Sequence, residues 1–180
     1  MSDIWVISDT HFNHNKDFIF GGQRGFSSVY EMNEAIIENW NKVVKPDDIV
    51  YHLGDMMLGQ LEDGLKIIKQ LKGRIYLAYG NHDTSSRLEA FSHAYNIEDI
   101  QFGYRLKAGK KTLLLTHYPT LTGNYDASKT YSIHGHTHSP NKFDKNHELT
   151  YNVSCEAINC TPINLEQILF EIRQWTKIIN

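Results

Sequence analysis

The sequence has little of several features that would each point to a particular class of protein. Only two of its 180 residues are cysteines, which is too few for a disulfide framework, and the spacing of Cys155 and Cys160 fits a zinc knuckle poorly. No apolar run approaches the ~20 residues that span a bilayer, so we expect no membrane partner. A net charge of −3 gives no basic footprint for duplex DNA, which weakens a nuclease hypothesis without excluding a local basic groove.

What remains is the composition of one globular domain. Hydrophobic residues make up 41% of the chain and aromatic residues 12%, which suits a packed core. We expect a single domain over residues 1–180, with no internal repeat or linker. Since no basic and apolar leader precedes the first apolar run at Ile4, the cytoplasm is the expected compartment.

Hydrophobic periodicity divides the chain into two halves. The first half alternates strands with helices, which favours parallel strands joined by helical crossovers. We expect strands over 4–8, 48–53 and 75–79, and helices over 29–45, 61–71 and 85–95. The second half predicts a hairpin of strands 101–107 and 111–116, strands over 131–134 and 149–153, and a helix over 165–178. Residues 118–130 lack periodicity and are a candidate substrate loop, and residues 139–148 should form an exposed turn.

Five short polar blocks follow apolar runs that we interpret as strands. They are Ser8-Asp9-Thr10-His11, Gly54-Asp55, Gly80-Asn81-His82-Asp83, Thr116-His117 and Gly135-His136-Thr137-His138. Side chains two residues apart in extended backbone project from the same side about 6.6 Å apart, so Asp9 and His11 can converge on one cation. Carboxylate, imidazole and carboxamide groups without thiolate suit Mn²⁺, Fe or Zn²⁺. Two such ions need a shared ligand, for which the carboxylate of Asp55 is the natural bridge.

Each block also has an ordinary structural explanation. Asp9 and Gly54-Asp55 can be turn residues, Asp83 can cap the following helix, and a single histidine such as His117 is more often structural than a ligand. All five blocks would then have to follow strands by accident, which is the weaker explanation.

The ordered set of blocks resembles the calcineurin-like metallophosphoesterase superfamily from Asp9 to His138, and the segment from Ser8 to Asp55 is similar to small bacterial and phage members. The resemblance implies an α/β fold, a four-layer α/β/β/α sandwich of two mixed sheets with the metals at the strand ends. It implies that one ion is held by Asp9, His11, Asp55 and His138, and the other by Asp55, Asn81, His117 and His136. His82 would face the scissile phosphate, with Asp83 orienting its ring.

The activity implied is that of a metal-dependent phosphoric ester hydrolase of the phosphodiesterase type. A hydroxide bridging two divalent ions would attack phosphorus in line, and His82 would protonate the leaving oxygen. Mn²⁺ is the expected ion, with Fe, Zn and Ni as alternatives. The family's phosphoprotein phosphatases carry an Arg soon after the Gly-Asp block, and residues 56–60 contain none, which favours a diesterase. A small nucleotide-like diester is the expected substrate; monoesters, a nuclease activity and an inactive scaffold are the alternatives.

Several polar residues lie outside the blocks. His14 and Arg24 are candidate substrate contacts, although each can equally be an ordinary residue of an exposed loop. We expect His52 to donate to a ligand carboxylate and His134 to be packed or hydrogen-bonded. Tyr118 and Tyr125 can stack on a base. The oligomeric state and the physiological substrate stay open.

Overall fold

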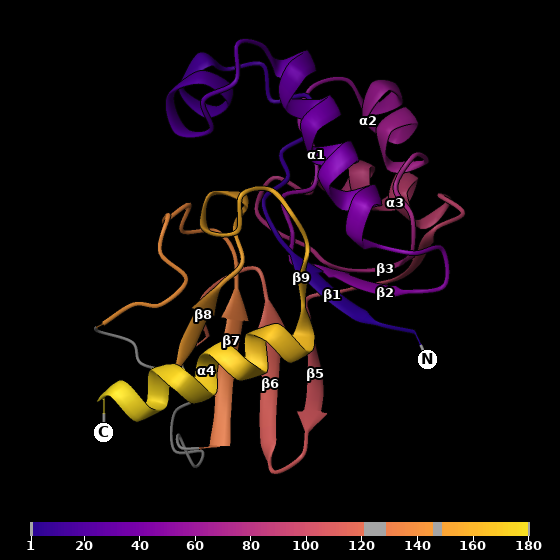
Figure 1. Cartoon of the computed structure of the whole chain (residues 1–180). Helices are drawn as coiled ribbons and strands as arrows, with labels where there is room; N and C mark the ends of the chain where they lie inside the picture. Colours follow the sequence, from indigo (N-terminus) through magenta and orange to yellow (C-terminus); the bar gives the residue numbers. More distant parts are fainter. Residues whose placement is uncertain (1, 121–128, 146–148, 180) are drawn as a thin grey trace.

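The computed structural model describes residues 2–120, 129–145 and 149–179, which form two mixed β-sheets with helices around them (Figure 1). The first sheet has the order β4-β3-β2-β1-β9, with β1 to β4 parallel and β9 antiparallel. The second has the order β5-β6-β7-β8, in which only the β5–β6 hairpin is antiparallel. The strands are β1 (Ile4–Ile7), β2 (Ile49–His52), β3 (Arg74–Ala78), β4 (Ile97–Gln101), β5 (Gly103–Ala108), β6 (Lys111–Thr116), β7 (Thr130–His134), β8 (Thr150–Asn152) and β9 (Ile163–Asn164). The predicted fold class is confirmed.

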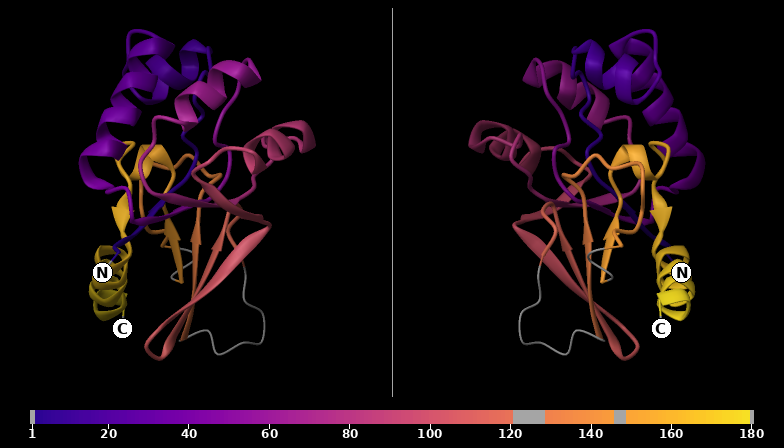
Figure 2. Two further views of the ribbon diagram at one scale, coloured as in Figure 1. Left: turned by 90° about the vertical axis from the view of Figure 1, so that its right-hand side faces the viewer. Right: turned by 90° about the vertical axis from the view of Figure 1, so that its left-hand side faces the viewer.

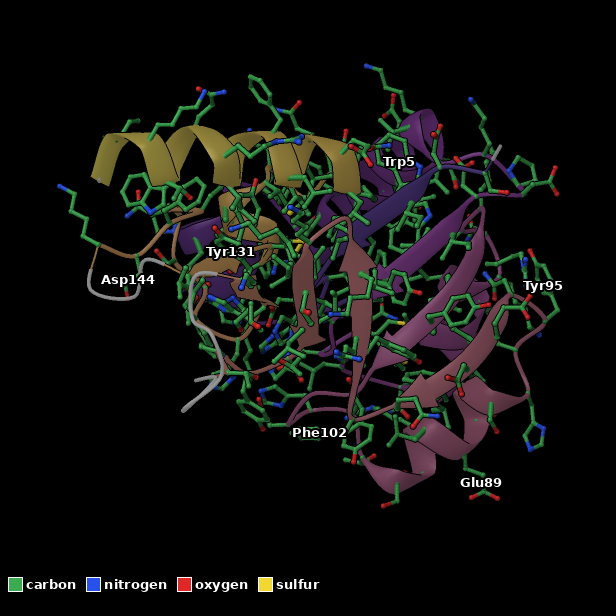
Figure 3. The ribbon with its side chains drawn as sticks, turned by 90° about the horizontal axis from the view of Figure 1, so that it is seen from below. Trp5, Glu89, Tyr95, Phe102, Tyr131 and Asp144 are labelled. Atoms are coloured by element: carbon green, nitrogen blue, oxygen red, sulfur yellow. The ribbon has the colours of Figure 1, made fainter. Side chains whose placement is uncertain are left out.

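Three helices cover one face of the first sheet, and a fourth lies along the second sheet (Figures 1 and 2). The three are α1 (Val29–Val43), α2 (Leu61–Ile68) and α3 (Ser85–Ser92), and the fourth is α4 (Leu165–Ile179). Seen from below, Tyr131 of β7 lies beside α4 (Figure 3), and its hydroxyl is 3.3 Å from the hydroxyl of Thr176. Within the described residues, no helix is both long enough and apolar enough to cross a bilayer.

The N-terminus of α1 follows the predicted pattern with one difference. The hydroxyl of Ser28 accepts a hydrogen bond from the backbone N–H of Glu31 at 3.1 Å, as a helix cap should. The carboxylate of Glu31 accepts from the N–H of Ser27 at 2.8 Å, one residue before the usual partner in a capping box. The helix buries Met32 and Trp40, so its apolar face packs into the core.

The sequence-based prediction missed both edge strands of the first sheet and two short helices. It assigned no strand between the third predicted helix and Gln101, where β4 lies, and none at the two-residue strand β9. Two of the five residues of β4 are acidic, and only Ile97 is buried, so the strand lacks the apolar run that reveals a central strand. It also missed the π-helix η1 (Phe18–Gln23) and the 3₁₀ helix η3 (Cys155–Ala157), which are too short to show a period.

The carboxyl ends of the two sheets meet, and this junction positions the polar blocks. Beyond β1 the backbone stays paired to the segment after β2, with the N–H of Asp9 bonded to Gly54 O at 3.0 Å. The segment after β8 leaves the second sheet and pairs with the end of β1, through Ser8 N–H to Val153 O at 3.0 Å and Cys155 N–H to Ser8 O at 3.1 Å. Side chains from both sheets are thereby brought to one place.

Candidate metal centre

Asp55 lies at the middle of a cluster to which all five blocks contribute. Its Oδ2 atom is 3.5 Å from His117 Nε2, 3.7 Å from His11 Nε2 and 3.9 Å from His82 Nε2. The carboxylate is 2% exposed, and Oδ1 accepts a hydrogen bond from the backbone N–H of His82 at 2.8 Å. Asp55, three residues beyond the end of β2, therefore faces ligand-type groups on two sides.

The first group of ligand-type atoms comprises Asp9, His11 and His138. His138 Nε2 lies 3.2 Å from His11 Nε2 and 3.5 Å from Asp9 Oδ1. One atom from each of the three residues lies within 4.8 Å of the others, a spacing that suits a single ion. Asp9 Oδ1 is buried and has no hydrogen-bond partner among the described residues. A buried acceptor without a donor is costly in an ion-free protein, and a cation would satisfy it.

The second group comprises Asn81, His117 and His136 together with Asp55. His117 Nε2 is 3.0 Å from Asn81 Oδ1 and 3.2 Å from His136 Nδ1. His117 Nδ1 lies 2.8 Å from the carbonyl oxygen of Leu53, which can only accept, so Nδ1 carries the proton. The Nε2 lone pair of His117 therefore points at the other groups, as a metal ligand requires.

The backbone at these residues is unusual. Asp9, His11, Asp55, His136 and His138 all have positive φ, between 48° and 66°. Non-glycine residues rarely adopt this conformation, and it is concentrated at functional sites. Gly54 has a φ of 91°, and a Cβ there would lie 2.6 Å from Gly80 N and 2.7 Å from His117 Nδ1. The tight turns after the strands therefore require a glycine beside the ligand-type residues.

His82 is accessible to solvent, as are Asn81 and His136 of the second group. Its side chain is 45% exposed, and its ring centroid is 5.5 Å from that of His11. The imidazole thus lies at the open side of the cluster, where a substrate could reach it.

Asp83 does not orient the ring of His82, which corrects the sequence-based expectation. Its Oδ2 accepts from the backbone N–H groups of Asp55 at 2.7 Å and Gly80 at 2.9 Å, and its Oδ1 from Met56 at 3.2 Å. Nor does it cap α3, whose N-cap is Thr84. The buried carboxylate instead ties the loop after β3 to the turn that carries Asp55.

We expect Asp83→Asn to lower the free energy of unfolding by about 2–3 kcal/mol, because a carboxamide has one acceptor oxygen for three backbone donors. Urea unfolding of the metal-free protein measures this. Asp63→Asn is the matched control, since that side chain is 59% exposed. Equal stability of Asp83→Asn and wild type would show that the three bonds contribute nothing.

Arg24 also has a place that the sequence did not predict. Its side chain is only 2% exposed, so it is neither a solvent-exposed loop residue nor free to contact a phosphate. The guanidinium donates to Asp9 O at 2.6 Å, to Thr10 O at 2.8 Å and to Glu156 Oε1 at 2.9 Å. Sequence reasoning missed Glu156, although it is the one charged residue between Thr150 and Leu165.

His14 lies beside the cluster. Its ring centroid is 5.3 Å from that of His11, and it meets the ring of Phe18 edge-on. Burial, and next the neighbouring imidazoles of His11 and His82, lower the pKa of His14 to about 4. His14 is therefore neutral near pH 7, and its substrate contact stays a prediction.

Two further parts of the predicted substrate region can be placed. The ring of Tyr118 lies 4.8 Å from that of His136 and 4.9 Å from that of His117, at the edge of the cluster. Tyr125 and residues 121–128 of the candidate loop fall outside the described residues, as do 146–148 of the predicted turn.

A cavity of about 1060 Å³ lies beside the second sheet, and its lining includes Thr137, Phe143 and Trp175.

His134 and His52 are both buried. His134 Nδ1 is 2.8 Å from Gly135 O, which confirms a hydrogen-bonded histidine. His52 donates to no ligand carboxylate, contrary to expectation. Its Nε2 lies 2.9 Å from the hydroxyl of Thr10, which itself donates to Met56 O, and its ring stacks on Trp40.

The stability of the protein should fall as the pH falls through the titration of His52. Burial lowers its pKa from 6.5 to about 3, so below pH 6.5 the unfolded chain binds a proton that the folded protein resists. Each pH unit between these values should remove up to about 1.4 kcal/mol from the free energy of unfolding. Urea unfolding of metal-free wild type and His52→Gln at pH 7 and pH 5 tests this. The pH dependence should be smaller in the variant, and an equal dependence would contradict it.

Two mixed sheets with carboxylates and imidazoles gathered at their strand ends define a metallophosphoesterase. The family model of the calcineurin-like phosphoesterase superfamily domain matches residues 3–158, and the chain belongs to that superfamily.

Three relatives show how far the similarity extends. An uncharacterized protein of Methanocaldococcus jannaschii is 36% identical over 94% of this chain and 90% of its own. The crystal structure of a protein of unknown function from Aquifex aeolicus matches with a TM-score of 0.72 and 26% identity, over 93% of this chain and 98% of that one. A structure described as a novel archaeal phosphodiesterase matches with a TM-score of 0.50 and 20% identity, over 83% and 82% of the two chains. At that identity the last match shows the shared fold alone.

Proposed function

We propose that this protein hydrolyses phosphodiester bonds with two divalent cations, and that its substrate is a small nucleotide-like diester. The observation that carries the proposal is the position of Asp55 between His11 and His117, each of which lies in a group of close ligand-type atoms. A single structural ion would need only one such group. Two groups that share a carboxylate match the arrangement in which paired ions act on one phosphate.

The residues fit two ions. Asp9, His11, Asp55 and His138 would hold the first, and Asp55, Asn81, His117 and His136 the second. The donor set is nitrogen and oxygen without sulfur, which suits Mn²⁺ first, with Fe, Zn and Ni as alternatives. When bound, the ions would neutralise charge on the phosphate and activate water. The orphaned Asp9 Oδ1 and the lone pair of His117 Nε2 support this fit.

The accessible His82 would act on the leaving group. It is exposed, close to Asp55, and has a backbone N–H fixed by the same carboxylate, so its ring is held at the open side of the centre. An imidazole donates a proton readily near pH 7. The neutral His14, whose ring also lies beside that of His11, would contact a phosphate oxygen as a hydrogen-bond donor.

The preference for diesters rests on the sequence, and one structural match agrees with it. Residues 56–60 carry no arginine of the kind that marks the phosphoprotein phosphatases, and the buried Arg24 does not replace it. The protein described as an archaeal phosphodiesterase shares the fold, and the proposed activity agrees with that description. Monoesters remain a secondary substrate class.

Hydrolysis of bis-p-nitrophenyl phosphate tests the proposal. Metal-free protein should be inactive, should gain turnover with added Mn²⁺, and should lose it with excess chelator. p-Nitrophenyl phosphate in parallel compares monoesters, and a labelled oligonucleotide tests for nuclease activity. The absence of Mn²⁺-dependent turnover on every one of these substrates would overturn the proposal.

A further inference from the structure

Glu156 lies in the segment after β8, where the chain leaves the second sheet and pairs with the end of β1. The function proposed above gives this residue no role. Ser154 in this segment pairs with Ser8, and the 3₁₀ helix η3, which contains Glu156, follows directly. The side chain is 5% exposed, so its charge is largely removed from water. Burying a carboxylate costs free energy unless the charge is paired or hydrogen-bonded.

The two oxygens of Glu156 have different partners. Oε1 accepts from Arg24 Nε at 2.9 Å, and Oε2 lies 3.1 Å from His138 Nδ1, within ion-pair distance but at an angle that does not form a hydrogen bond. Arg24 in turn holds the backbone carbonyl of Asp9. Glu156 therefore links Asp9, which follows a strand of the first sheet, to His138, which follows a strand of the second.

This arrangement has a chemical consequence for His138. A carboxylate 3.1 Å from Nδ1 favours the ring proton on that atom, which leaves a lone pair on Nε2, the atom 3.5 Å from Asp9 Oδ1. The same carboxylate offsets the positive charge of Arg24, which would otherwise oppose a cation nearby. Carboxylates that hold the far nitrogen of a ligating histidine fix its tautomer and raise metal affinity.

We propose that Glu156 is a positioning residue that holds His138 in the tautomer able to bind the first cation. The inference rests on the proposed function, since it assumes that His138 binds metal. Glu156→Gln tests it sharply because glutamine has one acceptor oxygen where two acceptors are needed. If that oxygen stays with Arg24, the amide NH₂ faces His138 Nδ1 and drives the ring proton to Nε2.

Two measurements separate this role from a merely structural one. In metal-free protein, ¹⁵N chemical shifts of His138 should show the Nδ1–H tautomer in wild type and the Nε2–H tautomer in Glu156→Gln. Titration with Mn²⁺ should show two ions in wild type, and in the variant one of them should bind about 10–100-fold more weakly. Glu166→Gln, on an exposed side chain in the first turn of α4, is the control and should match wild type.

A second variant guards against a folding defect. Glu156→Asp keeps the charge beside Arg24 but draws the carboxylate away from His138, so it should weaken the same ion. Wild-type tautomer and affinities in both variants would overturn the inference, as would loss of the fold in both, which would assign Glu156 to the sheet junction alone. If wild type itself binds no Mn²⁺, the proposed function fails first, and that result is distinct from either outcome.

Discussion

Replacing Asp55 with asparagine should reduce metal-dependent hydrolysis by at least about 10³-fold. Loss of a single preorganised group that stabilises charge in a transition state costs about 10²–10³, and Asp55 would serve both ions. A carboxamide has nearly the same shape and can still accept the backbone N–H of His82, so the loop should keep its place. Mn²⁺ titration should show weaker binding of both ions, because the shared ligand loses its charge.

The control for this variant is Asp63→Asn, which removes an equal charge from an exposed salt bridge with Lys66. It should leave turnover and Mn²⁺ binding unchanged. If Asp55→Asn instead weakened only one ion, Asp55 would be an ordinary ligand of a single site, and the proposed bridge would be wrong.

Replacing His82 with alanine should reduce turnover by about 10²–10⁴-fold while both ions still bind. The size of the loss should depend on the leaving group. A p-nitrophenolate leaves readily without a proton, whereas an alkoxide needs one, so the variant should lose far more activity on an alkyl diester than on an aryl diester. Steady-state rates on a matched pair of diesters, with Mn²⁺ saturating, give the comparison.

His93→Ala is the matched control, since that imidazole is exposed at the end of α3. An equal loss on both diesters in His82→Ala would argue that His82 binds the phosphate and does not protonate the leaving oxygen. Weaker Mn²⁺ binding in the variant would instead place His82 among the ligands.

The strand ends were the most predictable part of the structure. Strand β1 is a short run of apolar residues, and such a run that stops at a polar block marks a strand end. Parallel strands bring their carboxyl ends to one edge, so the meeting of Asp9 with Asp55 follows from order along the chain. The meeting of either residue with His138 did not follow from geometry, because it needs the second sheet to dock at the same edge. That part came from the resemblance to a family.

The supporting residues could not be predicted, for a physical reason. Arg24, Asp83 and Glu156 all bond to backbone carbonyls or N–H groups, or to one another, over long sequence separations. Such contacts produce no periodic pattern and no local motif in the sequence. A single charged residue in a sequence usually indicates a solvent-exposed position. The positive φ values of the ligand-type residues are equally hidden. Asp and His adopt that backbone conformation more often than most non-glycine residues, but only a minority of them do so.

The joining of the two sheets at their carboxyl ends has a consequence for how the protein matures. Asp9 and His136 are 127 positions apart and contact each other directly, and Glu156 follows later still. During synthesis the four parallel strands of the first sheet can pair while the chain is still incomplete, yet no pair of ion sites can exist until the second sheet has docked. Divalent cations therefore cannot guide the early steps of folding. They would bind only the folded protein with both sheets docked. Binding would shift the docking equilibrium towards that state and stabilise the contact between the two sheets.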